Sequence, residues 1–351
     1  MSGQRRHSLT GRARRQAGFS IVELMVALLM GLVLVVGVTQ VFLASQTSYR
    51  LQDDVSRMQE SGRYGFFYLT RELRMAGYLG CSRNAPLINI LNSPATGQGD
   101  FLFDFDRGGV EGFRGTGNGF APLLPADLQG LGAATASDVL LVRRVDSGTA
   151  RLAPPYIQEL SGGNAAGVFL QPDHGIETGD ILLISDCTAS TVFQTAGNPG
   201  SSNRAVINQG AGSPGNSTKS LGATYGEGSE ISRVSSTVFY IAPGSAGPSL
   251  FRAVNGAANA EELVENVERM RVRYGVDTTG NGVANNYELA DDVTDWARVV
   301  SARVSLLVRG SRDGLTENNQ NYVFDGVAIT ADDGRLRHVI TSTVALRNRL
   351  R

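Results

Sequence analysis

The sequence predicts an α+β protein, in which a long N-terminal α-helix packs by its second half on a β-rich globular domain with long loops. Three observations predict this fold class. No polar side chain occurs from Leu24 to Val38, which is typical of a helix that spans a membrane. Apolar residues then recur every three or four positions up to Ala76, as on one helical face. From about residue 79, short apolar runs alternate with Gly, Pro, Ser and Asn, as in strands and turns.

The first half of the helix, residues 19–44, is predicted to span the membrane. Its 26 residues would form a helix about 39 Å long, which is enough to cross the hydrocarbon core. The preceding flank is basic, because the first 18 residues contain five arginines and no Asp, Glu or Lys. The positive-inside rule places this flank in the cytoplasm and the rest of the chain outside.

The residues around Gly18 indicate how this segment is processed. An ordinary secretory signal has a small-residue cleavage site after its apolar run, but here the run leads into "SQTSYRLQDD". The small residue instead comes before the run, in "GFSIVELMVA". This arrangement strongly resembles the type IV prepilin signal. The resemblance implies that residues 1–18 are a basic leader removed by a prepilin peptidase, and that Phe19 becomes the N-methylated first residue.

Glu23 carries a charge near the start of the apolar run, and no other charge follows until Arg50. A carboxylate on a membrane helix costs about 2.5 to 3.5 kcal/mol near the bilayer centre and less towards an end, so it needs a partner or a function. The resemblance to pilins implies an assembly role, in which Glu23 pairs with the new terminal amine of a neighbouring subunit. The alternative is a carboxylate that rests at the level of the lipid headgroups.

Residues 45–78 are predicted to form the amphipathic half of the helix. The apolar stripe comprises Leu51, Val55, Met58, Gly62, Gly65 or Phe66, Leu69, Leu73 and Ala76. The opposite positions, which we expect to face water, carry Asp53, Asp54, Arg57, Glu60, Arg63, Arg71 and Glu72. A single helix would run to Met75 and end at Gly77. The alternative is two helices that are broken near Ser61 and Gly62.

Residues 79–351 are predicted to form the β-rich head domain. Candidate strands begin at Asp138, Asp180, Ile231, Ser249 and Arg269, and two longer ones occupy 297–310 and 336–348. The short segment 260–267, "AEELVENV", is expected to be a helical turn. Two segments without periodicity, 112–122 and 197–220, are expected to be exposed loops.

Several segments of the head make the resemblance to pilins more specific. They are "RELRMAGYLGC", "ISDC", "VERMRVRYGVDTTGNG", "ARVVSARVSLLVRG" and "TSTVALRNRL". Together they resemble PilW-type minor pilins of type IV pili over most of the chain. The resemblance implies a structural subunit that joins the major pilin, other minor pilins and an adhesin-like partner in a tip complex. Such a complex primes pilus assembly and supports adhesion or twitching motility.

The resemblance also implies where the protein acts. Before assembly it would be a single-pass inner-membrane protein with a periplasmic head, and after assembly it would lie in the pilus on the cell surface. The alternative is a minor pseudopilin of a type II secretion system, which shares the helix and the peptidase. Once the leader is removed the body is mildly acidic, at about −6, which argues against nucleic acid as a partner.

The chain has two cysteines. Cys81 directly follows the predicted helix, Cys187 closes a predicted strand, and 105 residues separate them. The exported compartment permits a disulfide between them, which we expect to tie the helix end to the sheet. In the chain-entropy model a loop of this size contributes at most about 4 to 5 kcal/mol. The alternative is two buried thiols.

The segment "DTTGNGVANNYE" meets much of the twelve-residue calcium-loop pattern. The candidate ligands are Asp277, Thr279, Asn281, Val283 through its carbonyl, Asn285 and Glu288. Only two carboxylates are present, Thr279 stands where Asp or Asn is usual, and strands rather than helices flank the segment. The alternative, which we favour, is a Gly- and Asn-rich hairpin loop without a cofactor.

Enzyme chemistry has little support in the sequence. His7 lies in the leader, and neither His174 nor His338 has a nucleophile motif such as G-x-S-x-G nearby. Two cysteines and the scattered histidines give no zinc spacing. We therefore expect a protein without catalytic activity. The alternative is an anchored hydrolase, which would need a pocket that holds His174 or His338 with a carboxylate.

Overall fold

The computed structural model describes residues 18–80, 86–92, 101–146, 150–160, 164–210, 212, 214–316 and 319–348. The chain divides into two compact units, Met1–Asp53 and Asp54–Arg351. We refer to them as the N-terminal unit and the head unit.

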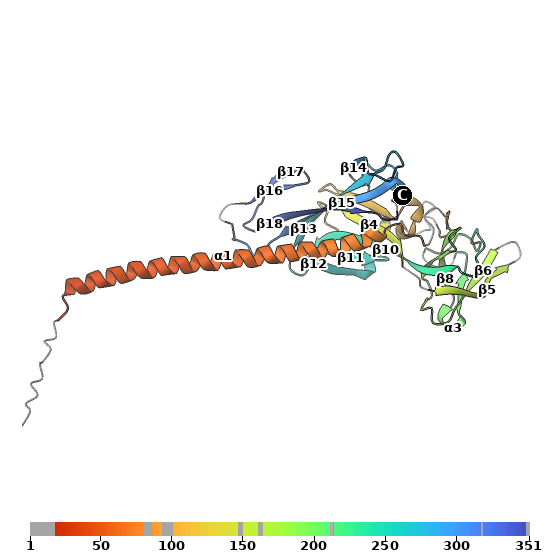
Figure 1. Ribbon diagram of the computed structural model, residues 1–351, viewed down its shortest axis with the longest axis horizontal. Coiled ribbons are helices and arrows are strands. Elements are labelled where there is room, and N and C mark those ends of the chain that lie inside the picture. The colour runs from red at the N-terminus through yellow and green to blue at the C-terminus, as the bar shows by residue number, and fades with distance from the viewer. Residues whose placement is uncertain are drawn as a thin grey trace, which may run out of the picture. The chain divides into compact units, whose positions relative to one another are not determined.

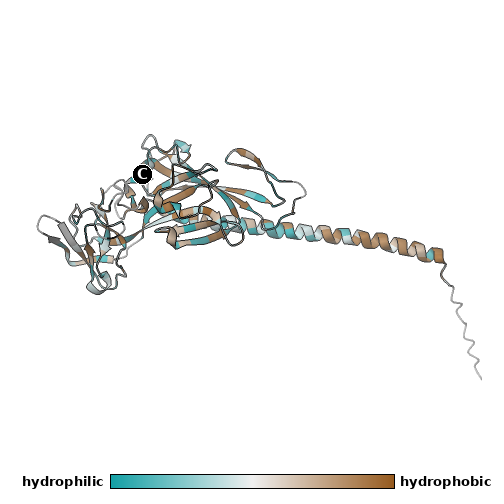
Figure 2. Ribbon diagram, turned by 180° about the vertical axis from the view of Figure 1, so that it is seen from behind, coloured by the Kyte–Doolittle hydropathy of each residue, from teal (hydrophilic) through white to brown (hydrophobic). Residues whose placement is uncertain are grey.

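Helix α1 (Ile21–Met75) runs through the end of the N-terminal unit into the head unit (Figure 1). It passes Ser61 and Gly62 without a break, so the two-helix alternative is wrong. The helix ends as predicted, because Gly77 adopts a left-handed φ of 67° and its N–H donates to the carbonyl of Arg143. Figure 2 shows the change in composition along α1, from mainly hydrophobic residues at the start to a mixed surface later.

From Val55 onward, the apolar stripe of α1 packs within the head unit as predicted, whereas Leu51 is 37% exposed. Met58, Leu69 and Leu73 are buried, and glycines admit the neighbouring sheet at two places. A Cβ at residue 62 would overlap the Ile340 side chain, and one at Gly65 would lie 2.9 Å from Leu306.

The prediction for the opposite face of α1 is wrong at two positions. Asp54 is 1% exposed and Glu72 is 4% exposed, although both were expected to face water. The spacing explains the burial, because Asp54 lies four positions before Met58 and Glu72 lies three positions after Leu69. Both carboxylates therefore lie at the edge of the apolar stripe.

The head unit is rich in strands. One sheet contains β1 (Leu87–Asn89), β2 (Val110–Gly115), β3 (Phe120–Ala121), β4 (Val139–Val145), β5 (Ala150–Leu160), β6 (Asn164–Leu170), β7 (Ile181–Ser185), β8 (Ser190–Ala196), β9 (Arg204–Ile207), β10 (Glu230–Pro243), β11 (Pro248–Val254) and β12 (Ala260–Glu265). A second contains β13 (Val267–Val276), β14 (Asn286–Glu288), β15 (Val299–Arg309) and β18 (Arg337–Ala345). A separate pair is β16 (Asn321–Phe324) with β17 (Val327–Thr330). The short helical elements are α2 (Ala126–Gln129), α3 (Pro199–Ser202), η2 (Phe101–Phe103), η3 (Phe105–Arg107), η4 (Ala257–Asn259) and η5 (Trp296–Arg298).

Strand β10 organises the large sheet. It pairs with β4 and β11 along its later part and with β5 and β7 along its earlier part, always antiparallel. In the second sheet the order is β14-β13-β15-β18. The long pairings of β15 with β13 and β18 confirm the two longer predicted strands. Three buried clusters form the core of the described residues. The one that includes β13 and β15 contains Met58, Leu69 and Leu73 of α1, and Ala76 directly after the helix.

A lobe built from β5–β9 lies between β4 and β10 in the chain (Figure 1). Strands β4 and β10 are antiparallel neighbours, with Val145 opposite Val234. The chain therefore enters and leaves the lobe at the same place. One buried cluster includes Val168 and Phe193 of the lobe together with Ile231 at the start of β10.

Three predictions for the head are wrong. Segment 260–267 is not a helical turn, because residues 260–265 form β12, which pairs with β11 and buries Val264. Segment 112–122 contains most of β2, together with β3, and these two strands pair with each other. Segment 197–220 contains α3 and β9, and β9 pairs with β6. In each case pairing with another strand stabilises a segment that lacks a clear period of its own.

Candidate assembly site

The predicted cleavage position lies just before α1. Gly18 and Phe19 precede the first helical turn, and both are exposed, with 80% of the Phe19 side chain accessible. Among the described residues, apart from its chain neighbours, none lies within 4 Å of the place where a Cβ at Gly18 would be. A peptidase could therefore reach this peptide bond without disturbing packed structure. The leader residues 1–17 lie outside the described residues, and cleavage and methylation stay predictions.

Glu23 lies in the first turn of α1 and is exposed. The helix begins at Ile21, and the carbonyl of Ser20 accepts the first helical hydrogen bond from the N–H of Leu24. The N-terminus of a helix carries a partial positive charge, so a carboxylate is favoured in this turn. The carboxylate thus lies four residues from Phe19, where cleavage would create an ammonium group.

From Leu24 to Leu43, the surface of α1 is largely apolar and exposed. Large side chains with more than half of their area accessible include Met25, Leu28, Leu32, Leu34, Val38 and Phe42. Among the described residues, α1 is the helix long and apolar enough to cross a membrane. Exposed apolar area of this extent marks a surface for lipid or for another protein.

A buried ion pair ties the end of α1 to the large sheet. The Nε of Arg144 in β4 donates to Oε2 of Glu72 over 2.6 Å, and the Glu72 side chain is 5% exposed. Burial acts to lower the pKa of Arg144, but Glu72 and then Asp146 outweigh it and raise this pKa above its usual range. The pair fixes α1 to the head close to where the helix ends.

The candidate calcium loop joins β13 to β14, and Asp277 organises it. Its Oδ1 accepts hydrogen bonds from the N–H groups of Thr279, Gly280 and Asn281, at 3.0, 2.7 and 3.3 Å, and its Oδ2 accepts one from Gly282 at 2.6 Å. Burial acts to raise the pKa of Asp277, but these backbone hydrogen bonds lower it below its usual range. The carboxylate is thus directed at the backbone of its own loop.

The amide side chains of this loop also accept hydrogen bonds from its backbone N–H groups. Oδ1 of Asn281 accepts from the N–H of Val283, and Oδ1 of Asn285 accepts from the N–H of Thr278. Glu288 lies in β14, opposite Tyr274. In the described part of the chain, no three His, Cys, Asp or Glu side chains form a group that could hold a metal ion. This geometry favours the hairpin-loop alternative, and the calcium site stays a prediction.

The predicted disulfide depends on a residue that the structure does not describe. Cys187 follows β7 with a left-handed φ of 70°, between Asp186 and Thr188. Cys81 lies outside the described residues. The pairing therefore stays a prediction.

The histidines do not form a recognisable catalytic site. His338 is exposed in β18, as expected for a polar strand face. His174 is 7% exposed and lines a cavity of about 390 Å³ with Asp173 and Glu230. Its Nδ1 accepts a hydrogen bond from the N–H of Ile176 over 2.9 Å, so Nε2 carries the proton of the neutral ring. Of the described residues that line this cavity, none carries a hydroxyl or thiol nucleophile.

These features define a class: a chain with an exposed N-terminal motif, a membrane-length apolar helix and a β-rich head. Residues 13–39 match the family model of the prokaryotic N-terminal methylation motif. Residues 238–348 match that of the type IV pilus-assembly protein W, or PilW. This range includes the last six residues of β10 and all of β11–β18. The chain is therefore similar to prepilin-like proteins of the PilW type over these two segments, and the resemblance seen in its sequence is confirmed. No curated protein and no solved structure matches the chain.

The matched ranges show which parts of the sequence carry the resemblance. The first range contains Gly18, Phe19 and Glu23. The second contains the two phrases from β13 and β15 and most of the C-terminal one. The phrases "RELRMAGYLGC" and "ISDC" lie outside both ranges, so the resemblance covers two segments rather than most of the chain.

Proposed function

We propose that this chain is a minor pilin, a structural subunit without catalytic activity that enters a type IV pilus through α1. The observation that carries the proposal is the joint presence of the methylation motif and the PilW match in one chain. Before assembly, the apolar helix anchors the protein in the inner membrane with its head in the periplasm. After assembly, the protein lies in the pilus on the cell surface.

Glu23 provides the proposed link between processing and assembly. Cleavage after Gly18 would create an ammonium group at Phe19, and Glu23 of a neighbouring subunit would pair with it. In a bilayer such a pair is strongly favoured over two separate charges, because neither charge is solvated there. Only processed subunits would then enter the fibre in register.

The position that we propose in the fibre is the tip. The head carries the β5–β9 lobe between two neighbouring strands, outside the PilW match. A shaft position repeated many times would have to pack this bulk around the fibre, whereas a tip position would not. There the head would contact other minor pilins and an adhesin-like partner, prime assembly, and support adhesion or twitching motility.

The first experiment replaces the assembly charge, as Glu23→Ala in the full chain. We expect normal cleavage and at least a tenfold loss of the protein from sheared pili, measured by immunoblot. Glu227→Ala is the matched control, because Glu227 is exposed in the head. Normal incorporation of Glu23→Ala would contradict the charge-pair mechanism.

The second experiment tests the cleavage position. Gly18→Asp should leave the protein at its precursor mass, because a side chain would occupy the position where the peptidase requires a glycine. Gly31→Ala is the control, since a Cβ there also meets no atom within 4 Å. A band of mature size for Gly18→Asp would move the cleavage site elsewhere.

Deleting this protein from the cell distinguishes a role in the pilus from a role in the related type II secretion system. We expect loss of surface pili or twitching with normal exoprotein secretion. Lost secretion with normal pili would instead identify a minor pseudopilin.

Separate measurements test the disulfide prediction and the calcium prediction. For a Cys81–Cys187 disulfide, mass spectrometry should detect free thiols only after reduction. For the loop 277–288, a calorimetric titration with calcium should show heat and a rise in melting temperature if the loop binds the ion.

A further inference from the structure

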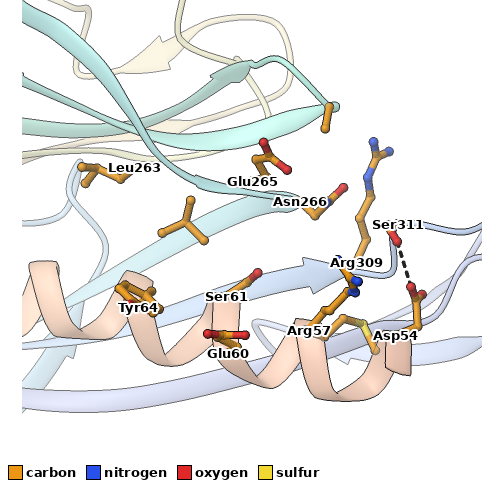
Figure 3. Close-up of a pocket in the computed structure, with 13 residues that line it drawn as sticks. Asp54, Arg57, Glu60, Ser61, Tyr64, Leu263, Glu265, Asn266, Arg309 and Ser311 are labelled. Atoms are coloured by element: carbon orange, nitrogen blue, oxygen red, sulfur yellow. Dashed lines mark hydrogen bonds between the residues drawn. The ribbon is translucent and has the colours of Figure 1, made fainter. Parts of the chain in front are cut away.

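The cleft between α1 and the turn from β12 to β13 is lined by charges of both signs (Figure 3). Arg57 and Arg309 lie there with Asp54, Glu60 and Glu265. A cleft with this mixture does not select a ligand by its charge. The edge of the second sheet has a more specific arrangement.

Strand β18 lies at the edge of the second sheet. In the described part of the chain its ladder partner is β15, and the register between them runs without a bulge. Just after β18, the N–H of Leu346 donates to the carbonyl of Val300 in β15. Alternate residues of an antiparallel strand bond to the same neighbour. The N–H and C=O groups of the even-numbered residues of β18 therefore point to β15, and those of the odd-numbered residues point away from it.

The backbone groups that point away form an open edge. Gln320 closes its first position, because its amide side chain accepts from the N–H of Arg337 over 2.6 Å and donates to the carbonyl of Arg337 over 2.9 Å. No described residue forms a hydrogen bond with the N–H or C=O of the next four outward positions. These positions are Val339, Thr341, Thr343 and Ala345. Their backbone groups are available to a further strand.

This edge lacks the features by which proteins usually prevent strand addition. Charged side chains, prolines and bulges commonly protect a sheet edge. Segment 338–345, "HVITSTVA", contains no Lys, Arg, Asp, Glu or Pro, and its register has no bulge. Its valines, isoleucine and threonines favour the extended conformation. The edge is thus suited to receive an added strand.

The inner face of β18 belongs to the core. The Ile340 side chain reaches α1, where a Cβ at Gly62 would overlap it. Val344 is 4% exposed and lies in the buried cluster that includes β13 and β15. Alternate side chains of an added strand would continue this face, so apolar residues are favoured at those positions.

The outer face carries positive charge beside the edge. A pocket of about 240 Å³ on this face is lined by Arg271, Arg273, Arg303, Ser305, Asp325 and Gly326. Arg273 forms an ion pair with Asp325 over 2.7 Å, and Arg271 forms one with Asp138 over 2.6 Å. No described carboxylate forms an ion pair with Arg303, so this arginine is the one that a carboxylate of a partner would complement.

Arg303 lies next to the edge strand. Its Nε donates to Oγ1 of Thr343 in β18 over 3.3 Å, and its guanidinium lies 4.0 Å from the centroid of the Tyr287 ring. The Arg303 side chain is exposed. A strand added to β18 would lie about 10 Å from β15, which is twice the usual strand spacing. The side chains of Arg303 and a glutamate can bridge this distance over the short side chain of Thr343, so the outer face favours an acidic residue on the added strand.

We propose that the open edge of β18 receives an extended segment of a neighbouring, different subunit as a fifth strand of the second sheet, with a carboxylate of that segment paired with Arg303. The inference rests on the proposed function, since it assumes a fibre in which the head has neighbours. A second copy of β18 does not fit, because segment 338–345 has no Asp or Glu to pair with Arg303. Backbone hydrogen bonds would hold the segment, and its alternation of apolar and acidic side chains would specify it.

The test places a photo-crosslinking amino acid at Thr341 or at Ala345 of the full chain, in cells that assemble the fibre. Mass spectrometry identifies the captured residue, and an immunoblot of sheared fibres measures incorporation in parallel. We expect both positions to capture one segment of another pilin-like subunit, and this segment should contain Asp or Glu. Because paired strands keep a constant register, the captured residue should move by about four positions along the segment between the two crosslinkers.

Two variants test the proposed contacts with the crosslinker at Thr341. Thr343→Pro removes an N–H that makes no bond to β15, and crosslinking should fall about tenfold because the added strand loses its donor. Arg303→Gln removes the charge, and crosslinking should fall about two- to fivefold, as for an exposed ion pair. Arg151→Gln, in which an arginine that is 71% exposed in β5 is replaced, is the control and should crosslink as the wild type does. Melting temperatures of the purified variants verify that each is folded, and Arg303→Gln tests the proposal without any change to the backbone of the edge.

Several outcomes would overturn the inference alone. In each, the protein enters fibres, but nothing, only lipid or only a second copy of this chain is captured, or the captured residue does not move with the crosslinker, or Arg303→Gln crosslinks as strongly as Arg151→Gln. If the wild-type protein is absent from fibres, the proposed function fails, and this inference falls with it.

Discussion

Asp138 shows how one residue can join the two sheets. It precedes β4, its side chain is 2% exposed, and its Oδ1 accepts from Arg271 over 2.6 Å and from the N–H of Gly115 over 3.0 Å. Its Oδ2 accepts from the N–H of Val272 in β13 over 2.8 Å. Burial raises the pKa of Asp138 to about 6, although Arg271 and the backbone donors act to lower it.

This pKa predicts a pH dependence of stability with a definite sign. Below the usual pKa of 3.8 the carboxyl is protonated in both states, so its contribution to stability is fully present. As the pH rises through about 6, the folded state must hold a buried charge and this contribution is lost. The free energy of unfolding of the wild type, minus that of Asp138→Asn, should therefore fall by up to about 3 kcal/mol between pH 4 and 7. Urea unfolding at several pH values measures it, and parallel curves would contradict it.

The sequence did not reveal that several charged side chains are buried. Asp54, Glu72 and Arg143 each lie in a segment whose element was predicted, yet their charge suggested a position in water. The structure buries Arg143 completely, and its guanidinium donates to the carbonyls of Phe101 and Leu102 and to Glu111. Such partners come from distant segments, so a local pattern could not supply them. Gly18, Phe19 and Glu23 could be proposed from the sequence, because their order along the chain is itself the signal, and residues 13–39 match the methylation motif.

At the scale of elements, the end of α1 depends on a close approach of two backbones. A Cβ at Gly109, just before β2, would overlap the N and Cα of Gly77. The carbonyl of Gly109 also accepts from the N–H of Arg143, whose own carbonyl accepts from Gly77. The helix end, β2 and β4 are thereby held together.

Gly109→Ala should therefore destabilise the head by about 1 to 3 kcal/mol, because backbone atoms have no rotamer by which to move aside. Thermal unfolding of the purified full chain in detergent measures the effect. Gly119→Ala is the control, since a Cβ there meets no atom within 4 Å. Equal melting temperatures for the two variants would exclude a tight contact between Gly109 and Gly77.

Periodic elements were predicted well, and aperiodic ones were not. The alternation in β13 and the three-and-four spacing in α1 each define a buried face without reference to other segments. In β12, by contrast, the Glu-rich composition suggested a helical turn, but Arg252 in β11 forms an ion pair with Glu261. Cross-strand partners of this kind decide the element, and the sequence of one strand does not contain them.

At the scale of the whole molecule, the division at Asp54 predicts an independently folding head. A fragment of residues 54–351 should unfold cooperatively, at a temperature within a few degrees of that of the full chain in detergent. A fragment of residues 76–351 should be far less stable, because Leu69 and Leu73 are fully buried and each contributes about 2 to 5 kcal/mol. Circular dichroism against temperature compares the two, and similar curves would mean that α1 is dispensable to the head.

The overall class could be predicted from the sequence, whereas the sheet topology could not. The apolar run and the β-rich composition define the helix and the head, and the matched family supports both. The pairing of β4 with β10 joins segments on either side of the whole lobe. Pairing two segments so far apart costs conformational entropy, and only the packing of the whole core offsets that cost. The sequence of a single segment does not reveal this packing.

The attachment of the lobe has an evolutionary consequence. Since Val145 and Val234 face each other, a short hairpin could replace everything between them while the other pairings of β10 with β4 and β11 stayed intact. Selection could therefore enlarge, exchange or lose the lobe in one genetic step, without altering α1 or its packing on the second sheet. The size of the lobe is thus not coupled to the pairing of β4 with β10 and of β10 with β11.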